Sequence, residues 1–155
     1  IAAQNGHMDV LRLLLEAGAD VNRPSGDGDT PAYIAAREGH LDVLRLLVDK
    51  GADVNRAMND RDTPAYIAAR EGHLEVLRLL VDKGADVNRA TEDGATPALI
   101  AAQQGHLDVL RLLVEKGNAD VNLRAGDGST PALVAAQEGH LEVVRLLVKA
   151  DVNLR

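Results

Sequence analysis

The chain has 155 residues, a formal net charge of −7, no cysteine and only two aromatic residues, both tyrosine. The acidic balance argues against nonspecific nucleic-acid binding, which requires basic patches, and the absence of thiols excludes disulfides and thiolate metal sites. No apolar run approaches the roughly 20 residues that a helix needs to span a membrane. With so few aromatic side chains, the core is expected to consist of Leu, Val, Ile and Ala in thin, closely stacked layers.

Three motifs recur along the chain at one common interval. The motif Gly-His-Leu/Met-Asp/Glu-Val places its histidines 33, 33, 33 and 34 residues apart, at His7, His40, His73, His106 and His140. The motif Thr-Pro-Ala follows the same steps, and Ala-Asp-Val-Asn ends at Asn22, Asn55, Asn88, Asn122 and Asn153. Self-similarity at a period of this length indicates a stack of repeated units.

The period predicts the domain organisation. We expect a single domain with a partial repeat at 1–24 and fuller repeats at 25–57, 58–90, 91–124 and 125–155. Because the sequence starts within a unit, we also expect it to be part of a longer array.

Each unit predicts two short helices and a turn, in an order that the repeat 58–90 illustrates. Thr63 and Pro64 are a good N-cap and first helical residue, and the first helix is expected to end at Gly72. A second helix follows, with one apolar stripe formed by Leu74, Leu77, Leu80 and Val81. Val76 and Leu79 widen this stripe, so the helix is expected to be buried on more than one side. The segment around Asp93-Gly94 then predicts a β-hairpin-like connection to the next Thr-Pro pair.

The predicted helices are too short to be stable in isolation. Each has only about 8–10 residues, whereas isolated helices below roughly 12–15 residues are marginal in water. The units are therefore expected to bury each other's apolar stripes. The fold class that follows is an all-α repeat solenoid of stacked helix-turn-helix units joined by β-hairpin-like loops.

The segment DGDTPAYIAAREGHLDVLRLLVDKGADVN resembles the ankyrin repeat, and the resemblance covers nearly the whole chain. The family's usual TPLH is TPAY or TPAL here, so Tyr33 and Tyr66 are expected to stack rather than to form the hydrogen bonds of the family's histidine. Arg61 stands where the other hairpins have glycine, which predicts either a strained φ angle or a different turn.

The resemblance implies a noncatalytic protein-protein interaction module that binds through its hairpin tips and the concave surface of its first helices. The matching tip positions are Asp27, Asp29, Asn59, Asp60, Asp62, Glu92, Asp93 and Asp127. The matching first-helix positions are Tyr33, Arg37, Glu38, Tyr66, Arg70, Glu71, Gln103, Gln104, Gln137 and Glu138. Although aspartate favours turns in any case, the carboxylates form one negative edge, which would steer a partner protein with a basic surface.

Candidate metal and modification sites have structural interpretations that fit better. The recurring histidines have no converging second ligand, so we interpret them as structural caps. The segments DGDTP and DRDTP faintly resemble a calcium loop, but Pro31 and Pro64 stand where that loop needs an oxygen donor. We interpret the Asp-Val-Asn asparagines as turn residues bonded to their own backbone. In ankyrin proteins this asparagine can be hydroxylated.

No phosphate loop, nucleophile motif or metal set is present, so we expect no enzyme, no cofactor, no nucleic-acid partner and no membrane insertion. We expect an intracellular, cytoplasmic protein that acts as a subunit of a larger complex. Two alternatives stay open. In the first, the chain is the scaffold or regulatory region of a larger enzyme or channel whose chemistry lies outside this sequence. In the second, it is an engineered ankyrin binder, since two repeats are nearly identical.

Overall fold

The computed structural model describes residues 1–58 and 60–153, and within these the chain forms helices and turns without a β-strand. The helices are α1 (Met8–Glu16), α2 (Pro31–Glu38), α3 (Leu41–Asp49), α4 (Pro64–Glu71), α5 (Leu74–Asp82), α6 (Pro97–Gln104), α7 (Leu107–Glu115), α8 (Pro131–Gln137) and α9 (Leu141–Asn153).

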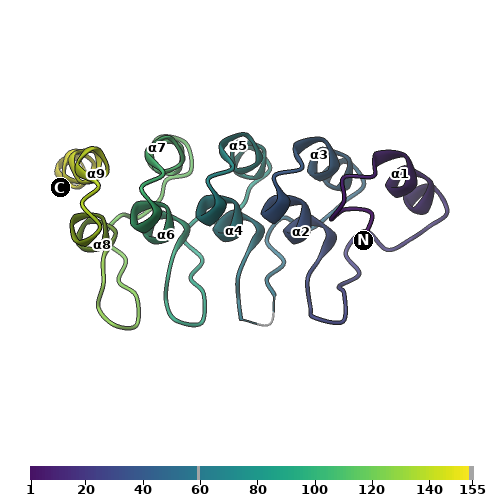
Figure 1. The fold of residues 1–155 in the computed structure, drawn as a ribbon, viewed down its shortest axis with the longest axis horizontal. Coiled ribbons are helices and arrows are strands. Elements are labelled where there is room, and N and C mark those ends of the chain that lie inside the picture. Colours follow the sequence, from purple (N-terminus) through teal and green to yellow (C-terminus); the bar gives the residue numbers. More distant parts are fainter. Residues whose placement is uncertain (59, 154–155) are drawn as a thin grey trace.

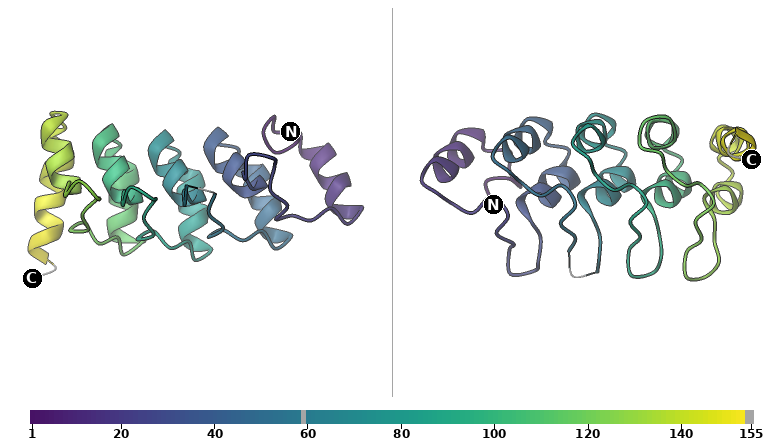
Figure 2. Two further views of the ribbon diagram at one scale, coloured as in Figure 1. Left: turned by 90° about the horizontal axis from the view of Figure 1, so that it is seen from below. Right: turned by 180° about the vertical axis from the view of Figure 1, so that it is seen from behind.

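The helices form two parallel rows. An outer row contains α1, α3, α5, α7 and α9, and an inner row contains α2, α4, α6 and α8, with four loops projecting away from the outer row (Figure 1). Each inner helix packs against the next inner helix and against the outer helix that follows it in the chain. The views from below and behind show the same linear order along the stack (Figure 2). The expected all-α solenoid is confirmed.

The inner helices begin and end where the sequence predicts. The Thr63 hydroxyl accepts a hydrogen bond from the backbone N–H of Tyr66 at 3.2 Å, and Pro64 occupies the first helical position. Gly72 ends α4 with a left-handed φ of 77°. A Thr-Pro start recurs in α2, α6 and α8, so the four inner helices share one local design.

The outer helices bury the widened apolar face that the sequence predicts, with Val76 and Leu79 on the inside. In α5 the buried residues are Val76, Leu77, Leu79 and Leu80, whereas Leu74 and Val81 are only partly buried. The small side chains Ala65, Ala68 and Ala69 of α4 are buried beneath them. This wide face follows from the position of α5, which packs on the inner helix α4 and also on α3 and α7, its neighbours in the outer row.

One predicted element is wrong at the end of the stack. The fifth Ala-Asp-Val-Asn segment does not form a turn, because α9 continues through it and ends at Asn153. Gly51 and Gly84, which follow the outer helices α3 and α5, take left-handed φ angles of 88° and 83°. No glycine stands between Lys149 and Asp151, so nothing there favours the left-handed residue that ends the earlier helices.

A candidate protein-interaction face

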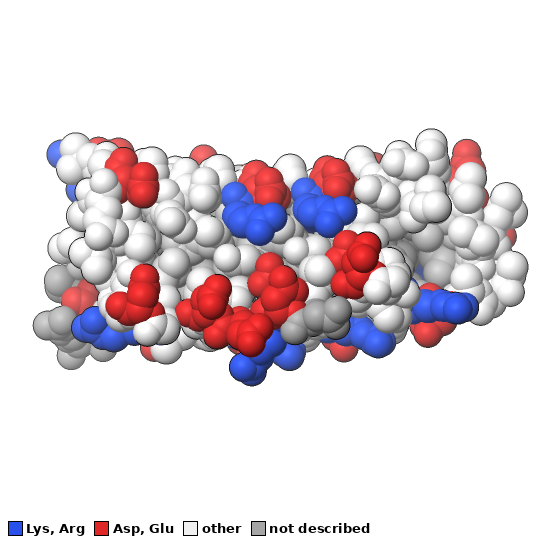
Figure 3. Space-filling model, turned by 60° about the horizontal axis from the view of Figure 1, so that its bottom comes forward, with Lys and Arg blue, Asp and Glu red and all other residues white. Residues whose placement is uncertain are grey.

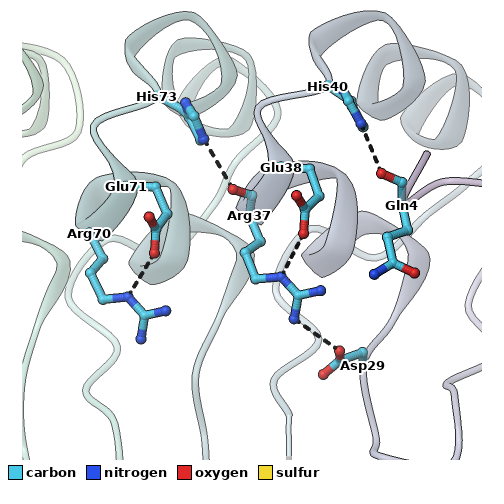
Figure 4. A network of polar contacts seen from close by, with 8 residues as sticks. All are labelled: Gln4, Asp29, Arg37, Glu38, His40, Arg70, Glu71 and His73. Carbon is cyan, nitrogen blue, oxygen red and sulfur yellow. Dashed lines mark hydrogen bonds and ion pairs between the residues drawn. The ribbon is translucent and has the colours of Figure 1, made fainter. Parts of the chain in front are cut away.

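Histidines at the start of the outer helices join neighbouring repeats. The His73 Nε2–H donates to the Arg37 carbonyl oxygen at 3.0 Å, and His40 donates to the Gln4 carbonyl at the same distance (Figure 4). His106 and His140 make the equivalent bonds. The acceptor is a carbonyl, so the proton must lie on Nε2. These histidines cap a carbonyl of the preceding repeat rather than their own helix, which shows no side-chain cap bond.

The Asp-Val-Asn asparagines also bridge repeats, which corrects the expectation that they bond their own backbone. The Asn55 Oδ1 accepts from the Asp86 N–H at 2.7 Å, and its Nδ2 donates to the Gly84 carbonyl at 3.1 Å. The local turn is instead made by Asp53, whose Oδ1 accepts from the Asn55 N–H at 2.9 Å. Asn22 and Asn88 repeat this pattern. The asparagines therefore form a ladder along the stack.

The four projecting loops share one turn geometry. We call them tip 1 (25–29), tip 2 (58–62), tip 3 (91–95) and tip 4 (125–129). In tip 1 the Ser25 N–H donates to the Asp29 carbonyl at 2.9 Å, and the Gly28 N–H donates to the Ser25 carbonyl at 3.1 Å. The same two bonds close the other three tips. Asn59, a predicted contact residue in tip 2, lies outside the described residues.

Backbone hydrogen bonds also connect successive tips. The Glu92 N–H donates to the Asp60 carbonyl at 3.1 Å, which joins tip 3 to tip 2. The Gly126 N–H donates to the Asp93 carbonyl at 2.8 Å, which joins tip 4 to tip 3. The main chain thus holds tips 2 to 4 in one row.

The tips carry a concentration of negative charge. Asp60, Glu92, Asp93 and Asp127 are exposed, and acidic side chains gather over the projecting loops (Figure 3). Burial raises the pKa of the half-buried Asp62 above its usual range, and the charge of Asp60 adds to this effect. The pKa of Asp127 is lowered because its carboxylate accepts from the Ser129 N–H, at 2.8 Å.

Arginines compensate this charge in only part of the face. The Arg37 Nε lies 3.0 Å from Glu38 Oε1, and one of its terminal nitrogens lies 3.3 Å from Asp29 Oδ2 (Figure 4). The Arg70 Nε lies 3.0 Å from Glu71 Oε1. The next two repeats carry glutamine at the position of these arginines, Gln103 and Gln137. Positive charge on the exposed inner-helix surface is thus confined to α2 and α4.

The comparison with known families agrees with this geometry along the whole chain. The family model described as "Ankyrin repeats (3 copies)" matches residues 1–91 and 86–155. The chain belongs to the ankyrin repeat family. Ankyrin repeats are generally protein-protein interaction modules. A search of curated proteins found no match.

In these ankyrin repeats the two tyrosines have different surroundings. Tyr33 is 4% exposed and belongs to the core, where desolvation, with a contribution from the charge of Asp62, raises its pKa to about 12. Tyr33 therefore offers no ring to a partner, and we remove it from the candidate contact residues. Tyr66 is half-buried and keeps part of its surface accessible. The expectation that this position packs rather than forming a histidine-type network is confirmed for Tyr33.

The remaining predicted contact residues lie on the outside of the ankyrin stack. The exposed ones, besides those on the tips described above, are Asp27, Glu38, Glu71, Gln103, Gln104, Gln137 and Glu138. Residues of tips 3 and 4 and of the helices α6 and α8 line a groove of about 520 Å³. Its lining includes the exposed carboxylates Glu92, Asp93 and Asp127 and the buried side chains Leu99 and Val134.

The sequence did not predict the inter-tip bonds or the asparagine ladder, because the bonded residues lie about one repeat apart.

Within 1–58 and 60–153, no three His, Cys, Asp or Glu side chains are grouped so that they could hold a metal ion. In the same part of the chain, no helix has the length and apolarity required to cross a membrane.

Proposed function

We propose that this ankyrin domain is a noncatalytic module that binds another protein through its four tips and the exposed residues of its inner helices. The observation that carries the proposal is where the near-identical repeats differ. Residues 30–57 and 63–90 differ only by Asp42 and Glu75, whereas the four tips read SGDGD, MNDRD, TEDGA and AGDGS. Packing constrains the helices, so variation on a rigid, exposed row of loops is typical of a surface that distinguishes partners.

The charge of the tips suggests the chemistry of the partner. Exposed carboxylates on successive tips give one edge of the stack a negative potential, and the chain as a whole carries a formal charge of −7. Such a field increases the association rate of a partner with a basic surface. Because the Debye length is roughly 8 Å at physiological ionic strength, salt is expected to slow this association.

The test is affinity capture with this chain, followed by kinetic measurements on the captured partner. The triple variant Asp27→Asn, Asp60→Asn, Asp93→Asn should keep its fold, because asparagine suits turns. Its association should be slower and less dependent on salt than that of the unmodified chain. The matched control is Arg45→Glu with Arg78→Glu on the outer helices α3 and α5. Loss of binding in the control, with the triple variant unaffected, would place the partner on the outer row instead.

A further inference from the structure

The inner-helix surface of this domain is nearly the same in two successive repeats. The segment TPAYIAARE occurs at 30–38 and again at 63–71, and in both copies the arginine pairs with the following glutamate. A partner that binds one copy would meet nearly the same side chains on the other, apart from the tyrosine, which is buried at Tyr33 and half-buried at Tyr66. A residue outside the helices that differs between the repeats would therefore contribute strongly to a single binding register.

Arg61 in tip 2 is such a residue, and its backbone is strained. It has a φ of 66°, in the left-handed region that tips 1, 3 and 4 fill with glycines at 89°, 80° and 84°. The turn bonds of tip 2 are the same as those of the other tips. Only glycine occupies this region without a steric penalty, so arginine is an unfavourable choice for the turn itself.

Contacts among the described residues do not offset this strain. The Arg61 side chain is exposed, and within the described residues its guanidinium has no ion pair or hydrogen bond. Strained residues of this kind are found preferentially at functional sites. The strain therefore favours a role for Arg61 in contact with another molecule.

The surroundings of Arg61 define what such a contact would be. Asp60 and Asp62 flank it in the sequence, and the backbone bond between Glu92 and Asp60 places tip 3 beside tip 2. Arg61 is the only arginine or lysine in the tip sequences. A cationic partner group would be attracted less strongly beside Arg61 than at a carboxylate of the neighbouring tips, whereas an acidic group would be attracted to the Arg61 guanidinium.

We propose that Arg61 sets the binding register of an otherwise basic partner by receiving an acidic side chain at tip 2. This inference rests on the proposed function of the face. A partner displaced by one repeat would place its acidic group against the carboxylates of tip 1 or tip 3 and a cation against Arg61. Both mismatches weaken binding, and they separate two registers that the nearly identical inner helices distinguish poorly.

Synthetic peptides provide a direct test. Neighbouring helices lie roughly 8–10 Å apart, and an extended chain advances about 3.3–3.6 Å per residue, so one repeat corresponds to about three peptide residues. The probes are the peptides KGSEGSKGSK and KGSKGSKGSK, each measured by fluorescence anisotropy at low salt against the unmodified chain and the variant Arg61→Gly. The glycine variant is expected to fold, because glycine stands at this position in the other three tips.

Arg61→Gly should weaken binding of the glutamate peptide and strengthen binding of the all-lysine peptide, so that their affinity ratio changes by about five-fold, as expected for an exposed charge pair. Arg61→Lys should keep the ratio of the unmodified chain. The matched control is Arg56→Gln, which removes the same charge from an exposed residue outside the tip and should leave the ratio nearly unchanged. Release of the strain should raise the Tm of Arg61→Gly by about 2–4 °C.

The possible failures are distinguishable. If both peptides bind and Arg61→Gly changes their ratio no more than Arg56→Gln does, then Arg61 does not set the register and the inference is wrong, while the proposed function stands. If neither peptide binds even at low salt, the proposed basic-partner function fails and the register proposal fails with it.

Discussion

The ring of His73 lies so close to Gly39 that a Cβ atom on this glycine would come within 2.7 Å of the ring's Cε1. The same ring donates its Nε2–H to the Arg37 carbonyl at 3.0 Å. Gly39 is also the residue that ends α2, with a left-handed φ of 73°. One glycine therefore meets two separate demands, a backbone conformation set by its own helix and a space required by the next repeat.

The first prediction separates these two demands with Gly39→Ala and Gly51→Ala. A Cβ on Gly51, whose φ is 88°, would meet nothing within 4 Å. Gly51→Ala should therefore cost only the left-handed conformation, about 1–2 kcal/mol. Gly39→Ala should cost about 1–3 kcal/mol more, because the hydrogen-bonded ring of His73 must move. Denaturant unfolding of both variants measures the difference.

A double variant shows whether the ring causes the additional cost. Replacing His73 by alanine in the Gly39→Ala background removes the atoms that clash, so the penalty of the glycine substitution should fall toward that of Gly51→Ala. Equal penalties with and without His73 would mean that the contact between ring and glycine contributes nothing.

The second prediction concerns the asparagine ladder. Asn55→Ala removes the bonds to the Asp86 N–H at 2.7 Å and the Gly84 carbonyl at 3.1 Å. The site is exposed to water, which replaces part of the loss, so the free energy of unfolding should fall by about 1–2 kcal/mol. Asn5→Ala is the control, because Asn5 is exposed and substitutions at such sites usually change stability by less than about 0.5 kcal/mol. Chemical unfolding of both variants provides the comparison.

Much of the fold can be predicted from local signals in the sequence. Thr63 and Pro64 start α4 and Gly72 ends it, and each of these signals acts within a few residues of its position. The exposure of the tips also follows locally, since Asp60 and Asp93 stand in turn-forming segments. The extension of α9, in contrast, depends on the absence of a glycine after Lys149. The recurring Ala-Asp-Val-Asn motif nevertheless predicts a turn at this point.

The candidate site was less predictable because its geometry depends on the stacking of repeats. Asn55 bonds to Gly84, 29 residues away, and His73 bonds to Arg37, 36 residues away. Such partners depend on how one repeat rests on the next, and a local motif does not encode this. The burial of Tyr33 has the same cause, because α2 packs against α4 and the charges of Asp62 and Arg70 in the next repeat act on the tyrosine.

The third prediction concerns the pH dependence of stability at Asp62. Its pKa is higher in the folded chain than its usual value of 3.8, so folding favours the protonated form. The resulting destabilisation is absent below the usual pKa, grows as the pH rises through it, and is complete above the folded pKa. Asp62→Asn should therefore raise Tm at pH 7 and leave it unchanged at pH 3.

Asp127→Asn is the contrasting variant, because the pKa of Asp127 is lowered by the Ser129 N–H. Its carboxylate stabilises the fold above the usual pKa, and this contribution is lost as the pH falls through the folded pKa. Asp127→Asn should therefore lower Tm slightly at pH 7. Thermal unfolding across this pH range gives both curves, and shifts of the same sign in the two variants would contradict the assignment.

The fourth prediction uses equivalent leucines of the outer helices as internal controls. Leu79 in α5 is 6% exposed, whereas Leu13, at the same position of the repeat in α1, is 67% exposed. The helix α5 packs between α3 and α7, but α1 stands at the end of the row. Leu79→Ala should reduce the free energy of unfolding by about 2–5 kcal/mol through lost burial and the cavity that remains. Leu13→Ala should change it by less than about 0.5 kcal/mol. Urea unfolding of both variants measures the two losses of stability. Equal losses would contradict the prediction, because they would show that α1 is packed as tightly as α5.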